Sequence, residues 1–279
     1  MQENQNPLTG YFRKPEIYIK LPSQGRYYPP GSIDLPTNGE LGVFPMTAKD
    51  ELIMKTPDAL LNGSGTVEVI RSCVPAIKDP WQLPSLDLDV ILIGIRIATY
   101  GDEMELTSTC PECKEQQDLA IDLGGLMTES MKWQYNNELV VGDLTIMFKP
   151  LTYQEMTSES MRQFEQNKLM KIINDENLDD ESRQQMFNES FIKLTAHTIN
   201  LIRKTIKKVT TPQGETEDVK HIQEFIENAD RKVFSAIQEH LDKQSVENGF
   251  AEFKIKCSNE KCVHEYTTPI VFDQTNFFV

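Results

Sequence analysis

Basic side chains are scarce in this sequence of 279 residues, where 28 Lys and Arg stand against 43 Asp and Glu and give a formal net charge of −15. Nucleic-acid-binding proteins usually carry the opposite sign, because contacts to phosphate need Lys and Arg. The one basic cluster, Arg203-Lys204 with Lys207-Lys208, ends a predicted helix. We interpret it as a solvated helix terminus, where cations complement the helix dipole, rather than as a nucleic-acid patch.

Long apolar runs are absent too. The longest covers residues 90–95 and stops at Arg96, whereas a membrane helix needs ~20 apolar residues. Residues 1–6 have neither the basic start nor the apolar stretch of a signal peptide. We therefore expect a cytoplasmic protein whose cysteines stay reduced, which favours metal binding over disulfides.

Histidine is rare, and familiar catalytic motifs are missing. The four histidines lie scattered at His197, His221, His240 and His264. No His-Glu-x-x-His pair and no Gly-rich phosphate loop occurs in the sequence. These absences predict a protein that is not an enzyme.

What the sequence does contain is a pair of cysteine knuckles, Cys110 with Cys113 and Cys257 with Cys262. The first lies between predicted strands at residues 103–108 and 117–123, and the second between strands at residues 251–256 and 265–272. Two thiolates on a tight turn can point at one cation, and tetrahedral Zn²⁺ needs four such donors. The pattern therefore predicts one structural Zn²⁺ site made of all four cysteines.

Other interpretations of these cysteines stay open at this stage. The four thiols form a disulfide or are unrelated, or the Cys-x-x-Cys is a redox pair, although that motif expects a βαβ context rather than flanking strands. His264 could replace a cysteine as ligand, but an ordinary polar residue on the outgoing strand fits it better. A zinc hydrolase needs an open coordination position, which four cysteines do not leave. We expect Cys73, the fifth cysteine, to be a small buried side chain.

The whole pattern predicts an α+β fold, a mixed β-rich body with a four-cysteine zinc-ribbon-like element and a long helical insertion. We expect four segments: an N-terminal arm at 1–15, the β-rich body with the first knuckle at 16–150, the helical insertion at 151–249, and the strand pair with the second knuckle at 250–279. The last segment completes the ribbon, so the metal site joins distant parts of the chain.

Capping motifs and apolar spacing place several elements in the first half of the chain. Thr47 with Asp50 forms a predicted capping box, and short helices follow at residues 57–63 and from about Gly65. Residues 86–101 fit a strand or a helix by periodicity, and their length favours a buried helix. Arg96 within that helix would then need a carboxylate partner, for which Asp50 and Glu51 are the candidates. A catalytic role for Arg96 is the less favoured alternative.

The second half begins with a predicted hairpin at residues 138–148 that turns at Gly142-Asp143. Thr152 then caps a helix with Glu155. A second helix starts at Asp179, carries Ile206 on its core stripe and breaks at residues 211–214. A third runs from Val219 to Asn248, with Asn228 restarting it through a cap.

A loop rich in rings and prolines follows the first predicted strand. Within residues 22–31, Tyr27, Tyr28, Pro29 and Pro30 form an extended segment that suits contact with a partner protein, since Pro supplies rigidity and Tyr supplies contact area. A loop that covers the protein's own core is an equally good interpretation.

Several sequence blocks resemble the T-even-type phage baseplate proteins. They lie at residues 21–29, 45–51, 57–63, 72–75 and 96–101 and read LPSQGRYYP, PMTAKDE, PDALLNG, SCVP and RIATYG. The resemblance covers about residues 16–270 and is more specific than either zinc knuckle alone. That family comprises hub subunits and hub-assembly proteins of contractile tails.

The resemblance implies a non-enzymatic structural or assembly component of the baseplate hub that acts through protein–protein contact. Its partners would be other hub and tail proteins, with no nucleic acid and no stable membrane insertion. It would be found in the host cytoplasm during assembly, and in the virion tail baseplate if it is retained. A zinc-ribbon nucleic-acid-binding protein is the alternative, which the acidic composition opposes.

Overall fold

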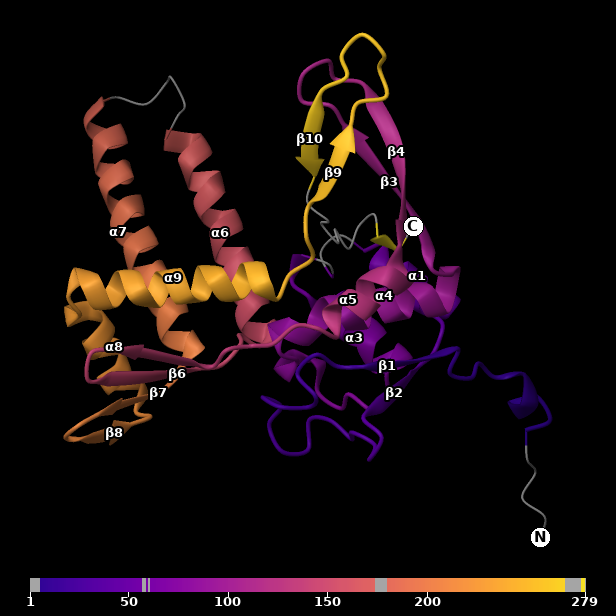
Figure 1. Cartoon of the computed structure of the whole chain (residues 1–279), viewed down its shortest axis with the longest axis horizontal. Coiled ribbons are helices and arrows are strands. Elements are labelled where there is room, and N and C mark those ends of the chain that lie inside the picture. The colour runs from indigo at the N-terminus through magenta and orange to yellow at the C-terminus, as the bar shows by residue number, and fades with distance from the viewer. Residues whose placement is uncertain (1–5, 57–58, 60, 174–179, 269–276, 279) are drawn as a thin grey trace. The chain divides into compact units, whose positions relative to one another are not determined.

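The computed structural model describes residues 6–56, 59, 61–173, 180–268 and 277–278. The chain forms two compact units, one of Met1–Pro80, Asp87–Trp133 and Gly249–Val279, the other of Trp81–Leu86 and Gln134–Asn248. Helices and small antiparallel sheets occur together (Figure 1), which confirms the mixed α+β class.

The first unit is built from three two-stranded sheets and a group of helices. The pairs are β1 (Ile17–Lys20) with β2 (Glu40–Val43), β3 (Glu103–Thr109) with β4 (Gln116–Asp122), and β9 (Phe253–Lys256) with β10 (Glu265–Thr268), all antiparallel. The helices are η1 (Thr9–Tyr11), α1 (Ala48–Met54), α3 (Ser64–Cys73), most of α4 (Ser85–Tyr100) and α5 (Leu123–Ser130), and η2 (Pro80–Gln82) comes before α4 in the chain.

The core of this unit forms where α4 meets the β1–β2 pair. Gly94 makes that approach possible, because a Cβ atom there would lie only 3.2 Å from Cγ2 of Ile19 and 3.7 Å from Cγ2 of Val43. Ile91 and Ile95 of the same helix are fully buried. The predicted buried helix at residues 86–101 is therefore confirmed, with burial on nearly all sides in place of a narrow apolar stripe.

The predicted carboxylate partner of Arg96 is wrong. Its Nη1 donates to the carbonyl of Phe277 at 2.8 Å, and the guanidinium lies 5.2 Å and 5.6 Å from the ring centres of Tyr100 and Phe277. A carbonyl and two aromatic faces accommodate this cation. Asp50 instead closes the predicted capping box with Thr47, and it also pairs with Arg13. The predicted helix at 57–63 includes positions 57, 58 and 60, which lie outside the described residues.

The second unit contains a four-stranded antiparallel sheet in the order β5-β6-β7-β8. Its strands are β5 (Glu138–Val141), β6 (Leu144–Phe148), β7 (Ile206–Thr211) and β8 (Gly214–Thr216), and its helices are α6 (Tyr153–Ile173), α7 (Asp180–Thr205), α8 (Val219–Asn228) and α9 (Arg231–Glu247). The β5–β6 hairpin confirms the predicted turn at Gly142. This one sheet joins strands from both sides of position 151.

Two predicted helix boundaries in this unit need correction. The helix expected to carry Ile206 ends at Thr205, because the β-branched segment from Ile206 to Thr211 pairs with β6 instead. The restart in the last helical segment uses Asp230, whose carboxylate accepts a 2.9 Å hydrogen bond from the N–H of Val233. Asn228 is the last residue of α8. The predicted box of Thr152 with Glu155 is confirmed.

An apolar cluster holds the sheet of the second unit to its helices. Its buried members are Ile146, Phe148, Ile202, Ile206, Val209, Ile222, Ile226 and Ile237. Above this cluster α6 and α7 run side by side and antiparallel (Figure 1). The buried carboxylate of Glu159 on α6 joins them, 2.9 Å from Nζ of Lys204 and 2.7 Å from Nε2 of His197.

Candidate metal centre

The first knuckle closes the β3–β4 hairpin with a fixed pattern of backbone bonds. The N–H of Cys110 donates to the carbonyl of Glu115 at 2.8 Å, and the N–H of Lys114 donates to the carbonyl of Cys110 at 3.0 Å. Lys114, directly after Cys113, has the left-handed φ of 63°. A side chain there costs ~1–2 kcal/mol, and the turn it makes directs both thiols to the same side.

The second knuckle repeats this pattern on the β9–β10 hairpin. The N–H of Cys257 donates to the carbonyl of His264 at 2.8 Å, which is again the second residue after the second cysteine. Val263, directly after Cys262, has a φ of 49°. A β-branched residue is unusual at a positive φ, so two unrelated sequences accept the same strain to form the same turn.

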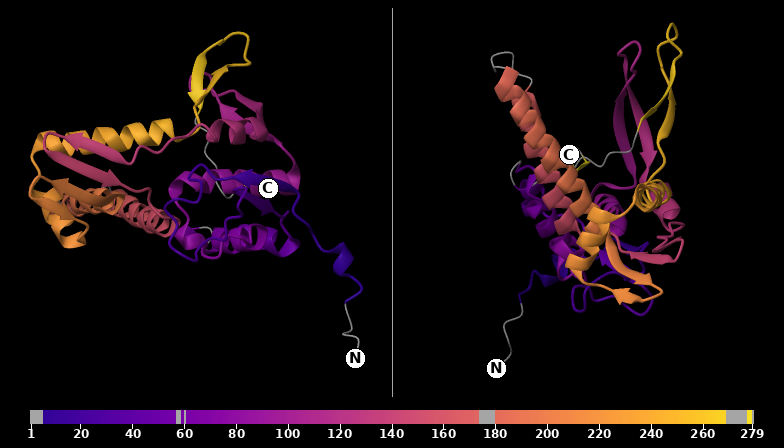
Figure 2. Two further views of the ribbon diagram at one scale, coloured as in Figure 1. Left: turned by 60° about the horizontal axis from the view of Figure 1, so that its bottom comes forward. Right: turned by 90° about the vertical axis from the view of Figure 1, so that its left-hand side faces the viewer.

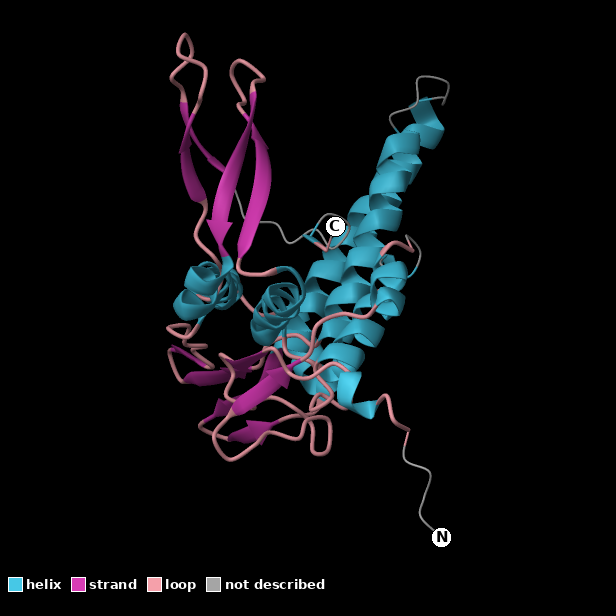
Figure 3. Ribbon diagram, turned by 90° about the vertical axis from the view of Figure 1, so that its right-hand side faces the viewer, coloured by secondary structure: helices cyan, strands magenta, loops and turns pink. Residues whose placement is uncertain are grey.

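The two hairpins stand side by side with both knuckles at the same end (Figures 1 and 3). There the sulfur atoms of Cys110, Cys113, Cys257 and Cys262 all lie within 4.8 Å of one another. The sulfur atoms of Cys113 and Cys257 are 3.5 Å apart, and those of Cys110 and Cys262 are 4.0 Å apart. Four thiolates around a tetrahedral Zn²⁺ with Zn–S bonds of 2.3 Å would be about 3.8 Å apart. The four residues thus fit a metal ion.

The backbone of the first knuckle favours a thiolate. The backbone N–H groups of Cys113 and Glu112 donate hydrogen bonds to the Cys110 sulfur and lower the Cys110 pKa to about 7. Desolvation of the thiol raises the pKa but has the smaller effect. At Cys257 the N–H of Asn259 also lowers the pKa, but burial and the sulfurs of Cys113 and Cys110 outweigh it and raise the pKa to about 12. Four thiolates this close together would repel one another strongly unless a cation were bound among them.

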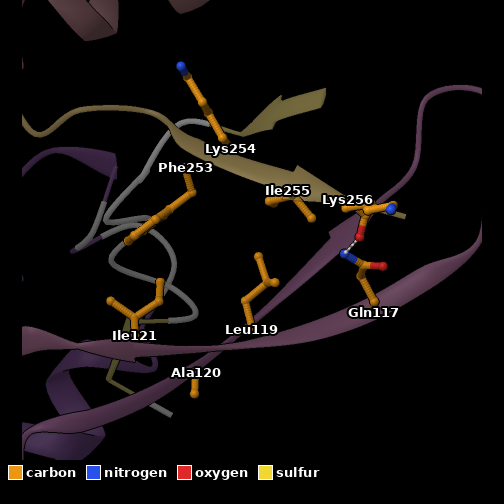
Figure 4. Close-up of a pocket in the computed structure, with 8 residues that line it drawn as sticks. All are labelled: Gln117, Leu119, Ala120, Ile121, Phe253, Lys254, Ile255 and Lys256. Atoms are coloured by element: carbon orange, nitrogen blue, oxygen red, sulfur yellow. Dashed lines mark hydrogen bonds between the residues drawn. The ribbon is translucent and has the colours of Figure 1, made fainter. Parts of the chain in front are cut away.

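The hairpins also meet below the knuckles, through side chains that face each other (Figure 4). Leu119 and Ile121 of β4 point toward Phe253 and Ile255 of β9 across a cleft of about 240 Å³. Gln117 spans its edge, accepting from the N–H of Ser258 at 2.6 Å and donating to the carbonyl of Lys256 at 3.1 Å. The apolar layer is small, so polar bridges and the knuckles carry much of the attachment.

Sequence reasoning did not find these bridging residues. Gln117 resembles any other polar residue after the first knuckle, and its partners lie 139 and 141 positions away. Ser108, whose hydroxyl lies 3.2 Å from that of Tyr266, gives no better signal. The sequence does hint that each hairpin has an inner face, because Leu119 and Ile121, like Phe253 and Ile255, are apolar residues two positions apart on a predicted strand.

The other candidate residues lie outside the cysteine cluster. His264 stacks on Tyr266, and its Nδ1 is 3.6 Å from the Glu112 carboxylate. Cys73 is fully buried, as expected, and desolvation raises its pKa to about 11, so it is not a reactive thiol at neutral pH.

The ring-rich loop is partly folded onto its own unit. Tyr27 and Tyr28 are half-buried, whereas Pro29 and Pro30 are exposed. Burial and the nearby Asp87 carboxylate raise the pKa of Tyr28 well above its ordinary value. Asp87 itself is buried and accepts from the N–H of Ser23 at 2.8 Å. This loop therefore covers the core with one side and faces solvent with its prolines.

Comparison with known proteins supplies the family. In the part of the chain that is described, no helix combines the length and the apolar character needed to span a bilayer. No curated protein and no solved structure matches the chain. The family model of the T4 bacteriophage base plate protein matches residues 15–279, nearly the whole sequence. The chain therefore belongs to the T4 bacteriophage base plate protein family.

Proposed function

We propose that this protein is a structural or assembly component of the baseplate hub, and that it acts by contact with other tail proteins rather than by catalysis. The family match over residues 15–279 supports this proposal most strongly. The cysteine cluster is consistent with it, because a metal with four protein ligands has no open position for a substrate.

We propose Zn²⁺ as the metal of this site. Four thiolate donors in a tetrahedral arrangement suit zinc better than the harder cations, which prefer oxygen. Structural zinc contributes on the order of 10 kcal/mol to the folding of small modules at neutral pH. Here Cys110, Cys113, Cys257 and Cys262 would hold it as a zinc ribbon that joins two hairpins with little apolar surface between them.

The metal is tested by elemental analysis of the purified protein. One zinc per chain, lost when Cys113 and Cys262 are both changed to Ser, supports the proposal. A zinc-free protein whose four thiols all react freely with a thiol reagent in the native state would show that the cluster does not bind metal.

We place the main partner contact in the region of residues 16–150, at the loop with Tyr27, Tyr28, Pro29 and Pro30. The exposed prolines would touch the partner, and the half-buried tyrosines would support them from below. Rigid residues suit an interface because little conformational freedom is lost on binding. The competing surface is the α6–α7 pair, part of whose side chains lie outside the described residues.

Complementation of a phage that lacks the gene tests the function. We expect tails without complete baseplates in the absence of the protein, and restoration by the wild-type chain. Mass spectrometry of purified baseplates and of the hub subassembly then separates a retained hub subunit from an assembly factor that departs. Normal baseplates in the absence of the protein would contradict the proposal.

A further inference from the structure

The two hairpins of the first unit run side by side, with their knuckles at the same end (Figure 2). Their sulfur atoms form two pairs, and each pair has one sulfur from each hairpin. The distance is 3.5 Å between Cys113 and Cys257 and 4.0 Å between Cys110 and Cys262. A disulfide bond is about 2.05 Å long, so each pair would have to close by about 1.5–2 Å. Rotation about the side-chain bonds of both residues can supply such a movement.

Each pair combines a thiol that solvent reaches with one that is buried. Cys113 is exposed and its neighbour Cys257 is buried. Cys262 is half-buried and its neighbour Cys110 is buried. Redox-active cysteines have this arrangement, in which an accessible thiol is oxidised first and a second thiol close by resolves the product. The cluster is therefore suited to oxidation as well as to metal binding.

The backbone of the first knuckle favours a bond between the hairpins over a bond within the knuckle. The N–H groups of Cys113 and Glu112 donate to the Cys110 sulfur, and a Cys110–Cys113 disulfide would have to pull that sulfur away from them. A Cys113–Cys257 bond leaves this arrangement in place. Once it has formed, Cys110 has Cys262 as its one remaining partner in the cluster.

We propose that hydrogen peroxide converts the cluster into two disulfides between the hairpins, Cys113–Cys257 and Cys110–Cys262, with release of Zn²⁺, an inference that rests on the proposed zinc site for the metal that leaves. The sulfur of Cys113 attacks the peroxide, so that an S–O bond forms, the O–O bond breaks and hydroxide leaves. The Cys257 thiolate then attacks that sulfur. An S–S bond forms, and the S–O bond breaks with loss of a second hydroxide.

The second pair reacts in the same way with a second molecule of peroxide. In each reaction two thiolates lose two electrons in total, and one peroxide is reduced to two hydroxides, which take up protons from the solution and become water. Zn²⁺ is released because no thiolate is left to bind it. A dithiol reductant supplied together with zinc reverses the change.

Bonds between the hairpins keep them joined after the metal has left. The apolar layer beneath the knuckles is small, and a disulfide within each knuckle would not connect one hairpin to the other. Cys113 and Cys257 are 144 positions apart, and long loops gain the most from a cross-link. The hairpins are then held by metal under reducing conditions and by disulfides under oxidising conditions, such as those outside the cell.

The test treats the purified full-length protein with hydrogen peroxide at neutral pH. A chromogenic chelator follows the release of zinc, a thiol label counts free cysteines, and mass spectrometry of unreduced peptides maps the disulfides. We expect loss of the bound zinc and of four of the five thiols, with the two disulfides between the hairpins as products. Cys73 is fully buried and should stay a free thiol. Cys73→Ala, the matched control, should give the same two disulfides.

Hydrogen exchange then shows whether the hairpins stay joined. The oxidised, zinc-free protein should keep the protection of the amides of β3, β4, β9 and β10, whereas reduced protein treated with a chelator should lose it. Any other cysteine pairing, or cysteines that stay reduced, would overturn the inference. Oxidised hairpins that exchange as fast as those of the chelated protein would also overturn it. A protein that holds no zinc before treatment but forms the same two disulfides would support the pairing and overturn only the proposed zinc site.

Discussion

The side-chain oxygen of Gln117 accepts a 2.6 Å hydrogen bond from the backbone N–H of Ser258, 141 positions later in the chain. The same amide donates to the carbonyl of Lys256. Between β4 and β9, which belong to different two-stranded sheets, this side chain takes the place of a strand–strand ladder. It ties the hairpins together close to the cysteine cluster.

Replacing Gln117 by Ala should loosen the hairpin pair. Two hydrogen bonds are lost, and because they are largely solvent-exposed we expect a cost of about 1 kcal/mol in the free energy of unfolding. The amide of Ser258 should also exchange faster with solvent. Gln116→Ala, one position earlier on an exposed site, is the control and should leave exchange at Ser258 unchanged. Equal exchange rates in both variants would show that the bridge is not stabilising.

Metal removal should act on one unit only. We expect a zinc chelator to expose the backbone amides of β3, β4, β9 and β10 to hydrogen exchange, because little apolar surface otherwise joins the hairpins. The sheet of β5 to β8 has its own apolar cluster and should keep its protection. Exchange measured by mass spectrometry checks this, and uniform loss of protection in both units would contradict it.

How far the sequence predicts this molecule depends on the range of the interactions. Capping at Thr47 and Thr152 and the turn at Gly142 are local patterns, and the structure confirms them. The knuckles are local patterns too, and the structure brings their four cysteines together in space. Ile206 was predicted to lie in a helix but belongs to strand β7, which pairs with β6. Arg96 was predicted to pair with a carboxylate but donates to the carbonyl of Phe277. Both outcomes depend on residues that are distant in sequence. Gln117 was missed for the same reason.

The aromatic pair near the C-terminus should be essential to the first unit. Phe277 and Phe278 are each only 3% exposed, and their carbonyls accept hydrogen bonds from Arg96 and Tyr100. Burying such rings is worth several kcal/mol, so Phe277→Ala with Phe278→Ala should cost more than about 3 kcal/mol in denaturant unfolding. Phe12→Ala, at an exposed ring, should cost nothing measurable. Similar midpoints for both variants would contradict this packing.

The second unit should lose stability in mild acid because of His240. This side chain is 8% exposed, stacks on Phe148 at 4.6 Å, and has its Nε2 3.1 Å from the carbonyl of Asn136. Burial lowers the His240 pKa below 6.5, and the charge of Lys243 lowers it further. The hydrogen bond to the Asn136 carbonyl and the charge of Glu247 act in the opposite direction but do not cancel the shift.

Proton linkage explains why the free energy of unfolding falls in acid. As the pH falls below about 6.5, the unfolded chain takes up a proton at His240 before the folded unit does, so the free energy of unfolding decreases.

The fluorescence of Trp81, which stacks on Tyr153 in the same unit, can follow unfolding at pH 7.5 and pH 5.5 in a Trp133→Phe background. His240→Gln keeps a donor for the Asn136 carbonyl but cannot titrate, and it should reduce the drop in stability between these two pH values. His221→Gln, at an exposed position on α8, should leave the drop unchanged. An equal drop in both variants would mean that another group causes the acid sensitivity.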